Sequence, residues 1–409
     1  MVTSSVRDPG RRGVLRVSDA EATALATLSD DAATVDVLQR ARVSRNMAFL
    51  SEVLRRLADG PARRIAMAGF DTLTVVQERN PAAAQEVLRH PRFGAWAATC
   101  ATGAAADADS DWAATHLACF AAAAAIRSGI EFDLELPQVG DCVVLPGLGC
   151  WVGPAARTAQ IHSAGHEIPD VEDRHWMPLR WLTSQRPNGI VRVEFDDLPP
   201  TPWAWPDIAP ADSHTRWSRW SALEFHRWQE LFDEAMRLLA GVVPELFGPL
   251  VRGMHAILPR SRRTSSFVTS TLVDSFGAAA MVLPTDAVRA ASGLLHEFQH
   301  SKLSALMEVR PLVAQEGPAD LPSPWRAEPR PASALLHGVY AHLAVARFVG
   351  RLPVRDTTGE ADAVRAATLT GCATLLHSQR LTAAGRRFVM SIQRTAELDG
   401  RRRWLTGRK

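Results

Sequence analysis

The sequence predicts a mostly helical α+β protein with a small β-rich section in its middle. Apolar residues recur at helical spacing through the first 128 residues and again after residue 220. Between these regions, short segments alternate polar and apolar residues, which is the pattern of half-buried strands. We therefore divide the chain into a helical N-terminal region (1–128), a β-rich section with a loop (129–210) and a C-terminal region (211–409).

The N-terminal region carries a clear signal for the start of a helix. Ser18 and Glu21 have the spacing of a capping box, in which the hydroxyl and the carboxylate each accept a free backbone N–H. This pattern predicts a helix that runs through Leu28. Three further segments show helical patterns: Thr34 to Ala58, Pro81 to His90 and Asp111 to Ser128.

The middle section predicts strands. Residues 131–136 read Glu-Phe-Asp-Leu-Glu-Leu, an alternation with the two-residue period of a half-buried strand. Residues 141–145 and 190–195 follow the same pattern and are separated by segments rich in Gly and Pro. Residues 199–210 hold five prolines and two tryptophans, so we expect a loop there.

The C-terminal region predicts mainly helices. A second capping box, Ser221 with Glu224, should start a helix that ends near Leu239. Residues 265–271 and 277–283 are β-prone, so we expect a β-hairpin there. Two long helices are expected after the hairpin: Asp286 to Val309 and Ser333 to Val349.

The composition excludes some classes of protein. Hydrophobic residues make up 46% of the chain, charged residues 22%, and the net charge is +2, so no excess of cations indicates nucleic-acid binding. The five cysteines form no C-x-x-C pair, which is weak evidence for disulfides or a thiolate zinc site. We see no signal peptide and no apolar stretch long enough to span a membrane, and we expect a cytoplasmic protein.

The motif His296-Glu297-Phe298-Gln299-His300 carries the chemistry of the chain. Helix positions four apart lie on one face, so His296 and His300 project from successive turns toward one point. Glu297 is rotated by about 100° from His296, which suits proton handling better than metal binding. The motif therefore predicts a catalytic divalent metal held by the two histidines, and a metal-dependent enzyme.

An open catalytic metal site needs a third protein ligand, and no residue follows the motif at a familiar spacing. We choose His337 from the next strong helix. On that helix Tyr340 lies near the His337 face, whereas His342 points away from it. Four carboxylates compete with His337: Glu308, Glu316, Asp320 and Glu328.

The segment between the two long helices presents two arginines. Prolines fix the shape of residues 323–331, which include Arg326 and Arg330. A rigid guanidinium can bind a carboxylate through two parallel hydrogen bonds. A structural loop with an ion pair explains the same spacing equally well.

Several segments together resemble a known family, the HExxH-domain proteins encoded beside radical SAM/SPASM maturases. These proteins are grouped as 2-oxoglutarate-dependent, HExxH-type β-hydroxylases of ribosomally made, modified peptides. The resemblance is specific over about residues 265–350. It rests on five short segments: Asp274–Ala278, His296–Leu303, Pro324–Arg326, Pro329–Pro331 and Leu335–Tyr340.

The resemblance implies an iron enzyme. Fe(II) would be held by His296, His300 and His337, and 2-oxoglutarate would chelate it through its C1 carboxylate and keto oxygen. The distal carboxylate of 2-oxoglutarate would meet Arg330 or Arg326. A three-histidine set would differ from the usual triad of two histidines and one carboxylate.

The resemblance also bears on partners and on the residue beside the motif. The substrate would be a ribosomally made precursor peptide, on which a radical SAM maturase could also act. Lys302 belongs to the family-like segment, but it lies about 160° around the helix from His300, which favours a structural or supporting role.

Two other functions remain open. In a zinc metallopeptidase, Glu297 would be the general base that activates a zinc-bound water, and Tyr340 could stabilise the oxyanion. The absence of a carboxylate ligand at familiar spacing counts against this interpretation. The second alternative is a non-catalytic, peptide-binding partner of a modifying enzyme.

Overall fold

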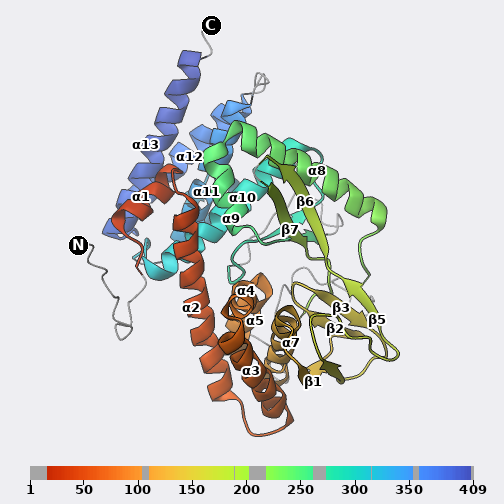
Figure 1. The fold of residues 1–409 in the computed structure, drawn as a ribbon. Helices are drawn as coiled ribbons and strands as arrows, with labels where there is room; N and C mark the ends of the chain where they lie inside the picture. Colours follow the sequence, from red (N-terminus) through yellow and green to blue (C-terminus); the bar gives the residue numbers. More distant parts are fainter. Residues whose placement is uncertain are drawn as a thin grey trace, which may run out of the picture.

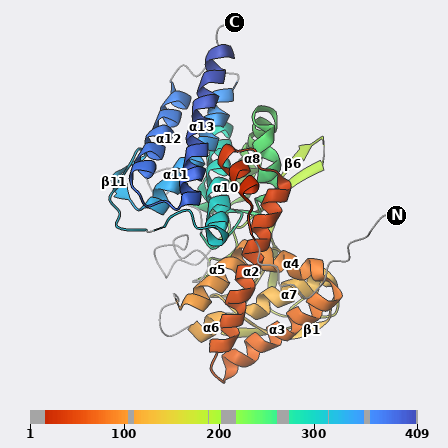
Figure 2. The ribbon, with the colours of Figure 1, turned by 90° about the vertical axis from the view of Figure 1, so that its left-hand side faces the viewer.

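The computed structural model describes residues 16–103, 110–187, 189–201, 218–260, 273–314, 316–352 and 359–406. Within them the protein has an α+β fold that is mostly helical, which confirms the predicted class. Figure 1 shows two lobes, and the long helix α2 (Ala32–Arg56) runs through both of them. The view in Figure 2 agrees: α2 passes from the lobe of α10 and α13 down to the lobe of α3 and α7.

The N-terminal helices begin largely where the sequence signals place them. Ser18 and Glu21 form the predicted capping box at the start of α1. Two helices were not predicted, α3 and α5, and each has a proline in its first turn, a position where the missing N–H costs nothing. Besides α2, the helices of this region are α1 (Asp19–Thr27), α3 (Pro61–Arg79), α4 (Pro81–Arg89), α5 (Pro91–Thr102), α6 (Ser110–Ala114) and α7 (Leu117–Ser128).

The predicted strands of the middle section are present, and the structure adds others. Strand β1 pairs with β4 in an antiparallel ladder, and β2, β3 and β5 form a second antiparallel sheet. Both sheets belong to the lower lobe in Figure 1, beside α3 and α7. Their bounds are β1 (Phe132–Pro137), β2 (Cys142–Leu145), β3 (Gly149–Val152), β4 (Thr158–Ser163) and β5 (His175–Pro178).

A four-stranded sheet has the order β6-β7-β8-β9. Strands β6 (Arg180–Arg186) and β7 (Gly189–Phe195) form an antiparallel hairpin, and β8 (Ala256–Arg260) runs parallel to both β7 and β9 (Ala278–Val282). The expected hairpin before the metal helix is therefore corrected in part. Its second strand exists as β9, but the described partner of β9 is β8, and residues 265–271 lie outside the described residues.

This sheet lies between two hydrophobic cores. On β8, Ile257 packs into the core of the C-terminal helices, whereas Leu258 packs into the core of the N-terminal helices. On β9, Met281 packs into the core of the C-terminal helices and Ala280 into the core of the N-terminal helices. The two strands agree because successive side chains of a strand point to opposite faces. Helix α1 and the first turns of α2 pack with the C-terminal core, so the two cores do not follow the order of the chain.

The C-terminal helices surround α10. Helix α8 begins at the predicted capping box of Ser221 and Glu224. Helix α11 is long and apolar enough to cross a membrane, but it packs against α10, α12 and α13 as a core helix. The helices are α8 (Ala222–Val242), α9 (Pro244–Gly253), α10 (Ala287–Val309), α11 (Ala332–Arg351), α12 (Glu360–His377) and α13 (Ala383–Thr406).

Lys302 anchors α10 to the N-terminal segment. Its ammonium donates to both carboxylate oxygens of Asp30, at 2.8 and 3.0 Å, and the two side chains are 1% and 0% exposed. Asp30 lies in the turn between α1 and α2, so this ion pair joins the start of the chain to the motif helix. The expectation of a structural or supporting role for Lys302 agrees with this geometry.

We predict that Lys302→Met lowers the free energy of unfolding by about 3–5 kcal/mol, because it leaves the Asp30 carboxylate buried without its cation. Urea denaturation of the purified protein measures this change. The matched control is Arg55→Met, which breaks an exposed ion pair of 2.7 Å with Glu52 and should change the stability far less, because water screens this pair. Equal losses for the two variants would show that the buried pair is not a special anchor.

Candidate functional site

Helix α10 presents the motif histidines along a single accessible strip. The helix begins at Asp286, whose carboxylate accepts from the backbone N–H of Arg289. Ser292, His296 and His300, each four residues apart, are partly exposed, while every residue between them is buried. Away from its exposed ends, the helix packs against α2, α8, α9, α11 and β9. The chain thus holds the two rings on a rigid support and leaves their edges open to a ligand.

The two motif histidines face each other at a separation that suits a shared ion. The Nε2 atoms of His296 and His300 lie 3.0 Å apart, and the rings stand at 89° to each other. Two nitrogens that each lie about 2.1 Å from one ion, at neighbouring positions, are about 3 Å apart. The Nε2 atoms of His296 and His300 are therefore at a distance that suits two ligands of one divalent metal.

Helix α11 brings two more histidines to the same place. The Nδ1 atom of His337 lies 3.2 Å from Nδ1 of His300. The His342 ring, which we expected to point away from the His337 face, lies 4.8 Å from the His296 ring, centroid to centroid, and so reaches the motif helix as well. Spacing along one helix does not predict this contact, because it does not show how far a neighbouring helix is rotated.

A tryptophan holds the His342 ring. Trp325 stacks on it with centroids 4.2 Å apart and planes 11° from parallel. The indole lies against Gly338 on α11, where an added Cβ would be 3.0 Å from the Trp325 ring. Gly338 therefore provides the close approach that lets Trp325 reach His342. We refer to His296, His300, His337 and His342 as the histidine cluster.

Burial keeps the histidine cluster neutral. Loss of hydration lowers the pKa of His296 to about 3 and the pKa of His337 and of His342 to about 4. Burial, followed by the neighbouring rings, lowers the pKa of His300 well below its usual value. Neutral imidazole is the form that binds a metal, so near pH 7 these side chains need not lose a proton first.

The four rings do not yet form a finished metal site. Among the described residues, no group of three His, Cys, Asp or Glu side chains is placed to hold an ion as it stands. His300 turns Nε2 toward His296 and Nδ1 toward His337. Its two neighbours therefore lie on different nitrogens of the same ring.

The two expected catalytic residues lie in different surroundings. Glu297 is 1% exposed within α10. The structure does not bring Tyr340 to the histidine cluster, because its ring packs against Phe388 at 5.6 Å and lies 5.8 Å from the Lys302 ammonium. Its hydroxyl is buried without a hydrogen-bond partner among the described residues. The catalytic role expected of Tyr340 stays a prediction.

The arginine segment is a short hairpin rather than a loop. Strands β10 (Leu321–Ser323) and β11 (Arg326–Arg330) pair in antiparallel fashion, which corrects the expected irregular structure. Arg326 is exposed and Arg330 is partly buried. Within the described ranges, no recorded contact joins either guanidinium to the histidine cluster, which the hairpin reaches through Trp325.

Three of the competing carboxylates have other partners. Glu308 accepts from Arg42 at 2.5 Å and lies 3.2 Å from Arg45. Glu316 accepts from Ser333, and Asp320 pairs with Arg380. The fourth, Glu328, is an exposed residue of β11. Glu316 is near enough to His337 to act on its pKa, which it raises against the larger effect of burial.

Comparison of the sequence with protein-family models and with curated proteins finds no match. The resemblance to HExxH-type hydroxylases, which rests on the motif segments, therefore stays a prediction.

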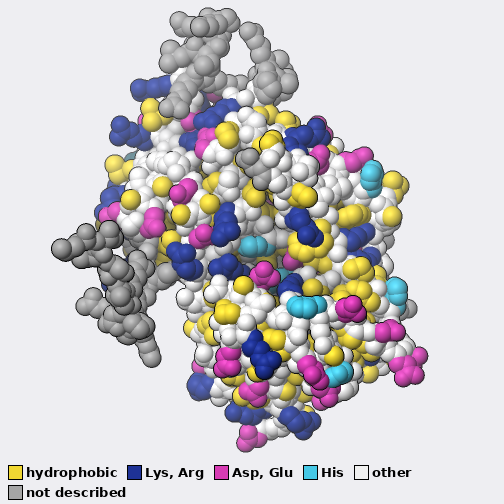
Figure 3. All heavy atoms as spheres, viewed as in Figure 1, with side chains coloured by type: hydrophobic (Ala, Val, Ile, Leu, Met, Phe, Trp, Pro, Cys, Tyr) yellow, Lys and Arg dark blue, Asp and Glu magenta, His cyan; other side chains and the backbone are white. Residues whose placement is uncertain are grey.

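On the face shown in Figure 3, acidic and basic side chains are interspersed rather than gathered by sign.

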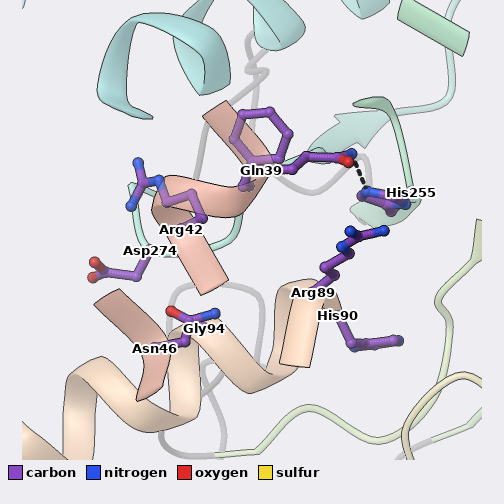
Figure 4. Close-up of a pocket in the computed structure, with 9 residues that line it drawn as sticks. Gln39, Arg42, Asn46, Arg89, His90, Gly94, His255 and Asp274 are labelled. Atoms are coloured by element: carbon purple, nitrogen blue, oxygen red, sulfur yellow. Dashed lines mark hydrogen bonds between the residues drawn. The ribbon is translucent and has the colours of Figure 1, made fainter. Parts of the chain in front are cut away.

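A second polar cluster lies at the junction of the two lobes, where Gln39 donates to Nε2 of His255 and also to the carbonyl of Arg252 (Figure 4). Its cavity of about 10 Å³ holds at most one water, so we regard it as structural. Burial lowers the pKa of His255 to about 4. The lining residues are Gln39, Arg42, Asn46, Arg89, His90, Gly94, His255, Asp274 and Phe276.

We predict that His255 makes the fold sensitive to acid. Its pKa in the fold, about 4, is below the value of about 6.5 in an unfolded chain, so the unfolded state gains a proton first as the pH falls. This histidine should therefore cost about 2 kcal/mol of stability between pH 7.5 and pH 5.

Urea denaturation across this pH range tests the prediction. His255→Gln keeps an acceptor for Gln39 and should remove that part of the slope. His226→Gln, at an exposed histidine of α8, is the control and should keep it. A slope that does not change in His255→Gln would contradict the assignment.

Proposed function

We propose that this protein is a metal-dependent oxygenase, an Fe(II)- and 2-oxoglutarate-dependent β-hydroxylase of a ribosomally synthesised peptide. The observation that carries the proposal is the pair of neutral imidazoles on α10, with Nε2 atoms 3.0 Å apart in the largely buried middle of the helix. Imidazole nitrogens suit Fe(II), and a site with few protein ligands leaves positions for a co-substrate and oxygen. The motif resemblance selects iron and 2-oxoglutarate over other metals and co-substrates.

The chain's own residues would do three things in this reaction. The histidines would hold the ion, the surrounding apolar helices would exclude water from it, and an arginine would bind the distal carboxylate of 2-oxoglutarate. Bound Fe(II) would supply the activation of oxygen that the protein's side chains cannot provide. We propose Arg330 or Arg326 for the carboxylate, because both belong to the hairpin that contacts the histidine cluster through Trp325.

The proposal also covers partners and location. The substrate would be a precursor peptide, which a radical SAM maturase could modify as well. Because such peptides are made on ribosomes in the cytoplasm, we expect the enzyme to act there.

We predict that the purified protein, given Fe(II), 2-oxoglutarate, air and its precursor peptide, forms succinate and adds 16 Da, about one oxygen atom, to the peptide. His296→Ala and His300→Ala should lose this activity together with the bound metal. His377→Ala, at an exposed histidine on α12, should behave as wild type. Mass spectrometry and a succinate assay measure both products. An unchanged peptide mass with no succinate would defeat the proposal.

A zinc peptidase is the alternative function, and Glu297 distinguishes it. A peptidase uses this carboxylate as general base, and removal of such a group costs about 100-fold or more in kcat. We predict instead that Glu297→Gln keeps its metal and at least about a tenth of the hydroxylation rate. Cleavage of the peptide by the wild-type protein with Zn²⁺, abolished in Glu297→Gln, would support the peptidase.

A further inference from the structure

We infer that His342, rather than His337, supplies the third nitrogen ligand of the metal, and that His337 positions His300. The inference rests on the metal site proposed above, but not on the identity of the metal or the reaction. It follows from the neighbour that each ring nitrogen faces.

The two nitrogens of His300 have different neighbours. Its Nε2 lies 3.0 Å from Nε2 of His296, and its Nδ1 lies 3.2 Å from Nδ1 of His337. A neutral imidazole carries one proton. If Nε2 of His300 binds an ion shared with His296, its proton must be on Nδ1. That N–H then donates to Nδ1 of His337.

His337 therefore has the geometry of a supporting residue. A metal-bound histidine almost always donates its second N–H to an acceptor, which fixes the ring orientation. His337 offers its Nδ1 lone pair for this purpose, so that atom cannot also bind the ion. Its Nε2 lies on the other side of its own ring, away from the Nδ1 that faces His300.

His342 has the opposite arrangement. Its Nδ1 lies 2.8 Å from the backbone carbonyl of Gly338, and a carbonyl can only accept, so Nδ1 carries the proton. The lone pair is consequently on Nε2, the nitrogen that no described hydrogen bond uses. The backbone of α11 thus fixes the tautomer that can bind a metal.

The His342 ring also lies close to a motif histidine. The rings of His296 and His300, whose Nε2 atoms are already at a shared-ion distance, have centroids 4.5 Å apart. The rings of His296 and His342 are 4.8 Å apart and nearly perpendicular, at 85°. The rings of His300 and His337 are farther apart, at 5.2 Å. Of the two candidates on α11, His342 lies on the side of His296 and is held there by Trp325.

One type of substitution separates the two roles. Asparagine places polar atoms near the Nδ1 position of histidine but has nothing at Nε2. His342→Asn keeps a donor for the Gly338 carbonyl and loses the proposed ligand atom. His337→Asn keeps an acceptor for His300. His377, whose Nδ1 bonds the carbonyl of Ala373 in the same way, provides the control variant His377→Asn.

The first measurement is a titration of the metal-free protein with Co²⁺, followed by its visible absorption. We expect His342→Asn to weaken Co²⁺ binding by more than about 100-fold, beyond the range seen when a supporting residue is lost. His337→Asn should stay within about 10-fold of wild type, and His337→Ala, which lacks the acceptor, should lose about 10–100-fold. His377→Asn should match wild type.

The second measurement counts imidazole ligands directly by pulsed electron paramagnetic resonance of the Cu²⁺-loaded protein. Wild type and His337→Asn should each show about three coordinated imidazoles, as a His₃ metal site does. This count tests the inference even if His342→Asn does not fold. Only two imidazoles in wild type, loss of one in His337→Asn, or unchanged Co²⁺ binding in folded His342→Asn would each overturn it.

These readouts are independent of the proposed reaction. A protein that binds metal as described but forms no succinate would contradict the hydroxylase proposal and leave the ligand assignment standing. A protein that forms succinate but binds the metal through His337 would support the hydroxylase proposal and contradict the ligand assignment.

Discussion

The arrangement of the C-terminal helices depends on the burial of α10. Other elements surround this helix on almost every side, yet it carries two polar imidazole rings. Apolar residues such as Leu295, Phe298 and Leu303 fill the core. The charged Lys302 is accommodated only because Asp30 meets it from the turn between α1 and α2. A buried ammonium without a partner would be too costly in a low-dielectric core. The start of the chain is therefore part of the support for the motif helix.

The histidines of α10 are more firmly supported than those of α11. His296 and His300 belong to a long helix packed against several others, so their relative position is fixed by the backbone. The other two histidines come from α11, and one of them is held by Trp325 of the β10–β11 hairpin. A hairpin of two short strands is a weaker structure than the helix that it covers.

The two lobes are joined by polar contacts as well as by the shared sheet. Arg92 of α5 donates twice to the carboxylate of Asp196, and both side chains are buried. His90 pairs with Glu194 nearby. A salt bridge of two buried groups is strong only where the geometry is good and each group is fully paired, as the two-point contact of Arg92 allows. These contacts fix β7, and through the sheet order they fix β8 and β9 beneath α10.

The sequence by itself determined much of the local structure, including the helix that carries the motif. Helix ends follow from short-range hydrogen bonds. A few neighbouring residues therefore predicted the capping boxes of Ser18 and Ser221, and also the helix that carries His296 and His300. The tertiary structure decided the rest: the parallel pairing of β8 with β9, the partner of Lys302, and the approach of His342 to His296. Each of these depends on how distant segments are placed and rotated against one another. That placement is set by the packing of whole cores and not by the spacing of residues within one element.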